Sequence, residues 1–172
     1  MERIAYIIPH FRGDPRIHCY KEIATAFKKK NIKVEGVRIP WNRNVMSDYI
    51  NHFLNRYYKE GNETYLFGFS LGAYISFVSS SKIFPKMQFL CSLSPYFKED
   101  LHLIKPSWRR YTGKRRMEDY RNFLFNDLAK DVSCRTLLIA GDKEDPVILR
   151  RAKDAHKKLS NSELVIIEDV RH

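Results

Sequence analysis

The chain has 172 residues, of which 44% are hydrophobic and 30% are charged, and its formal net charge is +11. This length suits one domain with a buried core, and this composition excludes disordered and fibrous proteins. The positive charge would attract an anionic ligand, an anionic membrane or nucleic acid, but it does not choose among them.

Targeting segments, disulfides and metal sites leave characteristic patterns, and none is found here. No apolar run approaches the roughly 20 residues that a bilayer requires, and the first residues lack the layout of a secretory signal. Cys19, Cys91 and Cys134 are widely spaced and form no Cys-x-x-Cys pair, so neither a disulfide framework nor a zinc site is indicated. We therefore expect a cytoplasmic protein without a membrane span, a metal or another cofactor.

Short apolar runs alternate with longer stretches of helical periodicity along the whole chain. In chain order, strands are predicted over residues 3–9, 33–39, 64–69, 87–94, 136–140 and 163–167. Helices are predicted over residues 17–30, 45–60, 71–82 and 147–159. This alternation is typical of βαβ units. It predicts a single α/β domain over residues 1–172, a three-layer sandwich with a mainly parallel sheet of about six strands.

The third predicted strand runs directly into the pentapeptide Gly68-Phe69-Ser70-Leu71-Gly72, a G-x-S-x-G motif. Between a strand and a helix, this motif forms a tight turn that holds its serine in a strained conformation and exposes the hydroxyl. The two glycines let neighbouring backbone pass closely. Ser70 is therefore the predicted nucleophile, and the alternative is a packing turn bounded by glycines.

A serine hydroxyl needs a base within hydrogen-bond reach and an acid that orients the base. The predicted strand over residues 136–140 ends in an acidic loop that contains Glu144 and Asp145, and His172 follows the last predicted strand. The chain order is thus serine, acid, histidine. The alternative role for the acids is to cap the helix that begins near Pro146.

In these features the sequence resembles the α/β-hydrolase superfamily. The segments that resemble its His-Gly loop, nucleophile elbow, acid loop and last strand are residues 7–13, 68–72, 141–147 and 161–167. The resemblance covers almost the whole chain and implies a minimal α/β-hydrolase fold with a Ser70–His172–acid triad. Its spacing rule points to Glu144 as the acid, whereas the Asp-Pro-Val sequence points to Asp145, so both remain candidates.

The resemblance also implies the groups that surround the nucleophile. The backbone N–H groups of Phe11 and Leu71 would hold the oxyanion, and His10 would shape the loop at the substrate site. A small cap is expected over about residues 95–133, where apolar side chains, among them Trp108, would line a pocket for an acyl group.

Over residues 105–121 this segment carries a local excess of five positive charges, which would steer an anionic substrate toward the site. The charged residues that give this excess are Lys105, Arg109, Arg110, Lys114, Arg115, Arg116 and Arg121, against Glu118 and Asp119.

The sequence therefore predicts a serine hydrolase that cleaves a carboxylic ester or thioester of a small acyl substrate through an acyl-enzyme. The alternative is a catalytically silent hydrolase-fold module that binds a ligand or a protein. Arginines interleaved with aromatic residues over residues 106–111 would suit single-stranded nucleic acid, but no nucleic-acid-binding module accompanies them, so that partner is not expected. The sequence does not define an oligomeric state.

Overall fold

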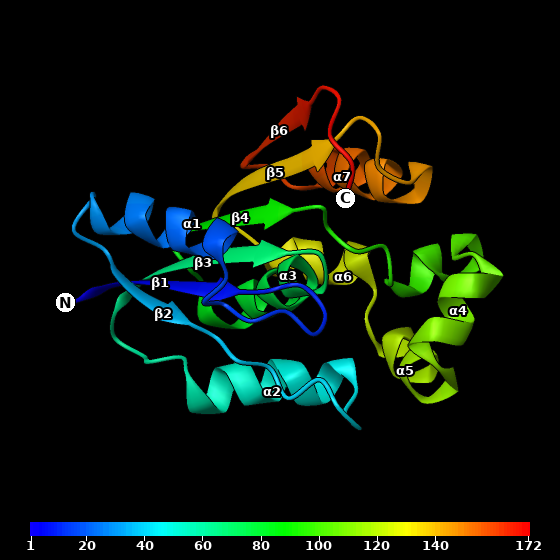
Figure 1. Cartoon of the computed structure of the whole chain (residues 1–172), viewed down its shortest axis with the longest axis horizontal. Helices are drawn as coiled ribbons and strands as arrows, with labels where there is room; N and C mark the ends of the chain where they lie inside the picture. Colours follow the sequence, from blue (N-terminus) through cyan, green and yellow to red (C-terminus); the bar gives the residue numbers. More distant parts are fainter.

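The computed structural model describes all residues from 1 to 172, and they form one open parallel sheet flanked by helices (Figure 1). The strands are β1 Arg3–Ile8, β2 Lys33–Gly36, β3 Glu63–Phe69, β4 Met87–Cys91, β5 Arg135–Gly141 and β6 Ser162–Ile167. They pair in the order β2-β1-β3-β4-β5-β6, and every pairing is parallel. The predicted six-stranded parallel sheet is confirmed.

Seven α-helices and three short 3-10 helices connect these strands. The helices are α1 His18–Lys28, α2 Met46–Arg56, α3 Leu71–Ile83, α4 Pro106–Thr112, α5 Lys114–Asp119, α6 Phe125–Leu128 and α7 Pro146–Lys158. The 3-10 helices are η1 Lys98–Leu103, η2 Tyr120–Asn122 and η3 Ala129–Asp131. All the short helices between β4 and β5 lie in the segment that the sequence predicts as a cap. None of the helices combines the length and the apolar character that crossing a bilayer requires.

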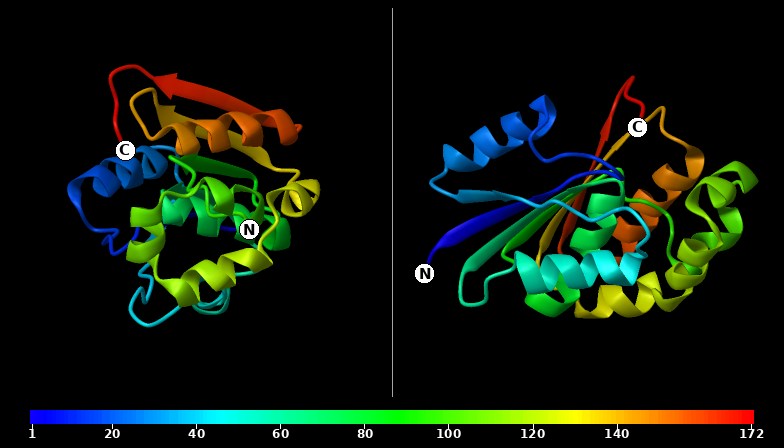
Figure 2. Two further views of the ribbon diagram at one scale, coloured as in Figure 1. Left: turned by 90° about the vertical axis from the view of Figure 1, so that its right-hand side faces the viewer. Right: turned by 60° about the horizontal axis from the view of Figure 1, so that its bottom comes forward.

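The alternation of side chains along β1 explains why the sheet lies between two layers. Ile4, Tyr6 and Ile8 point into the larger core, beneath α2, α3 and α7. Ala5 and Ile7 point to the opposite face, where α1 packs on them through its own apolar residues. Figure 2 shows α1 on one side of the sheet and the other long helices on the other side. Strands buried on both faces have the continuous apolar sequence seen here.

β1 is one residue shorter than predicted, and β2 and β4 are each shorter by three residues. Local backbone geometry explains the end of β4. β4 ends at Cys91 because Ser92 adopts a left-handed conformation with φ of 51°, which a continuing strand does not allow. β2 ends at Gly36, although the next N–H group, that of Val37, still donates to Ile7 O at 2.9 Å. Both strands end at the sheet edge that carries the functional residues.

Candidate active site

Ser70 lies in a sharp turn between β3 and α3, at the carboxyl edge of the sheet. Its φ and ψ are 58° and −118°, a region that non-glycine residues rarely adopt and that stores strain. A Cβ atom on Gly68 would lie 2.4 Å from Gly72 O, and one on Gly72 would lie 2.0 Å from Ile8 O. Both positions therefore require glycine, and the second brings the loop after β1 against the start of α3.

His172 connects Ser70 to a buried carboxylate. Its Nε2 atom lies 3.0 Å from Ser70 Oγ, and its Nδ1 atom lies 3.2 Å from Glu144 Oε2. The structure thus brings together a serine, a histidine and an acid from three different loops. A histidine that donates from Nδ1 to a carboxylate presents an unprotonated Nε2 to the serine, which is the tautomer that a general base needs.

The side chain of Glu144 is only 1% exposed, and three hydrogen-bond donors fix its carboxylate. Besides His172, its carboxylate accepts hydrogen bonds from Ser92 Oγ at 2.5 Å and from Gly141 N–H at 3.0 Å. Burial raises the pKa of Glu144, but these hydrogen bonds outweigh burial and leave the pKa below its ordinary value. The carboxylate therefore remains ionised and can stabilise a positive charge on His172.

The neighbouring acid, Asp145, has a different environment. Its Oδ1 atom accepts from Val147 N–H at 3.1 Å, so it caps α7, and its Oδ2 atom forms an ion pair with Lys105 of the cap segment. Asp145 lines the cavity at Ser70, but no hydrogen bond joins it to His172. Of the two acids that the sequence left open, Glu144 is the one that contacts the histidine.

His172 is held in place by the segment that precedes it. Lys143 N–H donates to Val170 O at 3.0 Å, and Asp142 N–H donates to Ile167 O at 3.0 Å. A Cβ atom on Gly141 would lie 2.1 Å from Val170 O, so this close approach depends on glycine. The imidazole of His172 also stacks on Phe69, with ring centroids 5.2 Å apart.

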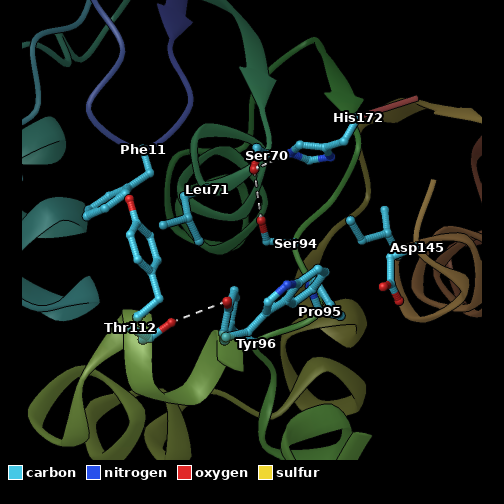
Figure 3. A pocket seen from close by; sticks show the side chains of 12 residues that line it. Phe11, Ser70, Leu71, Ser94, Pro95, Tyr96, Thr112, Asp145 and His172 are labelled. Carbon is cyan, nitrogen blue, oxygen red and sulfur yellow. Dashed lines mark hydrogen bonds between the residues drawn. The ribbon is translucent and has the colours of Figure 1, made fainter. Parts of the chain in front are cut away.

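Two backbone N–H groups near Ser70 are free to bind an anion. Phe11 N–H donates to no other group of the protein. Leu71 N–H is the first of α3 and has no acceptor within the helix. Both residues line the cavity beside Ser70 (Figure 3), where their N–H groups can stabilise an oxyanion.

A cavity of about 300 Å³ opens in front of Ser70. Its floor and sides come from the sheet edge, and its other wall comes from the cap segment (Figure 3). The lining residues are Phe11, Ser70, Leu71, Ser94, Pro95, Tyr96, Trp108, Tyr111, Thr112, Asp145, Ile148 and His172. Besides His172, four of the lining side chains are aromatic, and no lysine or arginine is among the lining residues.

His10 does not line this cavity, although the sequence analysis placed it at the substrate site. Its Nδ1 atom lies 2.8 Å from Tyr20 OH, and its backbone N–H donates to the same hydroxyl at 3.0 Å. Burial, together with the charge of His172, lowers the pKa of His10. A neutral His10 can accept the Tyr20 proton, so Tyr20 fixes both the ring and the backbone of this loop residue.

Three further residues that surround the site were not predicted from the sequence. Ser92 binds the acid, Ser94 Oγ lies 3.4 Å from Ser70 Oγ, and Tyr20 holds the loop after β1. Ser92 and Ser94 follow the end of β4, so their place at the carboxyl edge of a parallel sheet was a usable signal. Tyr20 gave no such signal, because a tyrosine on the apolar face of a helix is typical of a core residue. The structure contains no group of three or more His, Cys, Asp or Glu side chains that could hold a metal ion.

Comparison with solved structures identifies the fold. Est1E from Butyrivibrio proteoclasticus superposes with a TM-score of 0.83 and 13% identity over 99% of this chain and 80% of its own, and a second structure of Est1E has ferulic acid bound. Alpha/beta hydrolase domain-containing protein 10 from mouse superposes with a TM-score of 0.70 and 10% identity, over 98% of this chain and 81% of its own. An esterase from Pyrococcus furiosus superposes with a TM-score of 0.68 and 13% identity, over 99% of this chain and 74% of its own. Neither a protein-family model nor a curated protein matches the sequence. The chain therefore has the α/β-hydrolase fold, as its sequence predicts, at identities too low to carry over an activity.

Proposed function

We propose that this protein is a serine hydrolase that cleaves a carboxylic ester or thioester. The observation that carries the proposal is the continuous set of contacts from Ser70 Oγ to His172 Nε2 at 3.0 Å and from His172 Nδ1 to Glu144 Oε2 at 3.2 Å. These are the distances over which a base can accept the proton of an attacking hydroxyl. That several solved structures of this fold are esterases or hydrolases supports the same reading.

The first half of the reaction forms an acyl-enzyme. His172 Nε2 accepts the Ser70 proton while Oγ bonds to the carbonyl carbon, and the carbonyl oxygen becomes an oxyanion within reach of the Phe11 and Leu71 N–H groups. When the tetrahedral intermediate collapses, the bond to the leaving alkoxide or thiolate breaks, and His172 gives its proton to that group. Glu144 stays ionised throughout and stabilises the imidazolium.

The second half returns Ser70 to its starting state. Water gives a proton to His172 Nε2 and attacks the acyl carbon, and the second tetrahedral intermediate releases the carboxylic acid as Ser70 Oγ takes the proton back. Each half uses the same oxyanion donors, so the two transition states are stabilised by one preorganised arrangement.

The cavity limits the acyl group that this site accepts. A volume of about 300 Å³ lies at the lower end of the range for small-molecule sites, and the aromatic lining favours an uncharged, apolar group. We expect a short aliphatic chain or a single aromatic ring rather than a long lipid chain. The expected anionic substrate gains no support from this cavity, because no lysine or arginine lines it.

Covalent labelling with a fluorophosphonate probe tests the proposal without knowledge of the substrate. Wild type should be labelled, Ser70→Ala should not, and His172→Ala should be labelled at a rate lower by at least about 10²-fold. Ser94→Ala is the matched control, because its hydroxyl lies 3.4 Å from that of Ser70 and its loss should leave the label in place. Absence of labelling in wild type would contradict the proposed serine hydrolase and favour a catalytically silent binding module.

A further inference from the structure

No lysine or arginine of the cap segment lines the cavity at Ser70, although Lys105 forms an ion pair with Asp145, which does. Four of these basic residues line a second cavity of about 500 Å³, which we call the cap cleft. Its lining residues are Lys98, Leu101, His102, Arg109, Lys114, Met117, Glu118 and Arg121. Helix α4 separates the two cavities, since it gives Arg109 to the cleft and Trp108, Tyr111 and Thr112 to the cavity at Ser70.

Positive charge in the cap cleft is largely unneutralised. Lys98, Arg109, Lys114 and Arg121 face a single carboxylate, that of Glu118, which forms an ion pair with Arg121 at 3.2 Å. The amino groups of Lys98 and Lys114 have no hydrogen-bond or ion-pair partner. Like charges gathered around one concavity repel one another, and an anion bound among them removes this repulsion.

Arg109 is held in position before any ligand binds. Its Nε atom donates to Ile104 O at 3.0 Å, and its Nη2 atom donates to Leu101 O. Its Nη1 atom has no partner in the protein, so one face of a fixed guanidinium remains available. An arginine that is already immobilised loses little conformational entropy when it binds an oxyanion.

The other lining residues restrict the kind of anion. Leu101 and Met117 are the only apolar residues in the cap cleft, and no phenylalanine, tyrosine or tryptophan lines it. Single-stranded nucleic acid binds chiefly by stacking successive bases on aromatic rings, and the cleft offers only the imidazole of His102. A small anion with several charged oxygens matches four surrounding cations better than a single carboxylate does.

We propose that the cap cleft is a binding site for a small phosphate-bearing anion, a diphosphate or a phosphate monoester, separate from the cavity at Ser70. Arg109 and the two unpaired lysines, Lys98 and Lys114, are its principal ligands. The site does not depend on ester hydrolysis, so its test is a binding measurement on the intact protein.

Isothermal titration calorimetry with inorganic pyrophosphate at a fixed ionic strength of about 0.1 M tests the site. Wild type should bind one equivalent, and Lys98→Gln/Lys114→Gln should bind at least about tenfold more weakly. The matched control is Lys28→Gln/Lys29→Gln, which removes the same charge from two exposed lysines at the end of α1. This control should change the affinity by less than about twofold.

A second variant should increase the affinity. Glu118→Gln removes the only carboxylate of the cap cleft and frees Arg121, so pyrophosphate should bind about three- to tenfold more tightly. Glu22→Gln, an exposed residue of α1, makes the same change in net charge and should have little effect. Because Glu118 is exposed, this variant should fold normally.

Three results would overturn the proposal. The first is the absence of saturable pyrophosphate binding to wild type, and the second is an equal loss in both lysine double variants, which would indicate attraction to net charge alone. The third is a pattern typical of a nucleic-acid-binding surface. In that case an oligothymidylate binds through Lys98 and Lys114, its affinity rises with its length, and pyrophosphate binding does not saturate.

Discussion

The two walls of the cavity at Ser70 are built in different ways. The sheet-edge wall consists of short loops in which Ser70, His172 and Glu144 are fixed by hydrogen bonds, close backbone approaches and a strained turn. The cap wall consists of short helices that present aromatic rings, with Tyr111 68% exposed. We infer that the first wall determines the rate of the chemical step and that the second selects the acyl group.

The largest expected effect is a difference in kcat between substitutions of the two adjacent acids, Glu144 and Asp145. Glu144→Gln removes the charge that orients and stabilises His172, and we expect kcat to fall by about 10²- to 10⁴-fold. Asp145→Asn removes the same charge one residue later but keeps a side chain that caps α7, so kcat should stay within about threefold. Steady-state kinetics on a short-chain activated ester measures both, and equal losses would mean that Glu144 has no special part.

A smaller effect should follow from releasing the loop after β1. Tyr20→Phe removes the hydroxyl that bridges His10 N–H and Nδ1, so the adjacent Phe11 N–H should become less well placed for the oxyanion. We expect kcat to fall about tenfold with KM unchanged, because an oxyanion contact acts in the transition state. Tyr65→Phe is the control, since it removes a hydroxyl bonded to Glu63 and Arg3 at the far end of the sheet.

The pH profile distinguishes this positioning role from a general loss of stability. His10 is kept neutral by its lowered pKa, and on acidification below that pKa a proton on Nδ1 prevents it from accepting the Tyr20 proton. Wild type should therefore show a loss of activity as the pH falls through the lowered pKa of His10. This acidic step should be absent from Tyr20→Phe, and an unchanged profile in the variant would contradict the bridge.

The cap wall should give the smallest effect on rate. Trp108→Ala removes a half-buried ring from the cavity, and we expect KM for a single-ring aryl ester to rise about tenfold, or about 1.4 kcal/mol, with kcat within about threefold. Arg110→Ala, an exposed position on the same helix that lines neither cavity, should leave KM unchanged. A large loss of kcat in Trp108→Ala would show that the cap also positions the chemical groups.

Much of the fold could be predicted from the sequence because each level of the pattern agrees with the others. Buried strands, helical periodicity and the glycine positions around Ser70 all indicate the same parallel sheet and turn. The positions where strands end were harder to predict. Ser92 ends β4 through a left-handed backbone conformation, which a serine in the sequence does not indicate.

The site could be predicted only in part, for a reason that the acidic loop illustrates. Glu144 and Asp145 are adjacent and chemically similar, so sequence spacing could not choose between them. Their side chains diverge in the structure, one toward Ser92 and His172 and the other toward Val147 and Lys105. The basic residues of the cap segment illustrate the same limit. Composition places them near the active site, but four of them line the separate cap cleft.

The close approach of Gly141 to Val170 has a consequence for how the protein loses activity. His172 belongs to residues 168–172, which are docked by one backbone hydrogen bond, from Lys143 N–H to Val170 O, by an ion pair between Lys143 and Asp169, and by one stacked ring. Local opening of such a segment requires less free energy than unfolding the sheet. Mild denaturant should therefore abolish ester turnover before the helical circular dichroism changes, and a single shared transition for the two signals would show that this segment is as stable as the sheet it rests on.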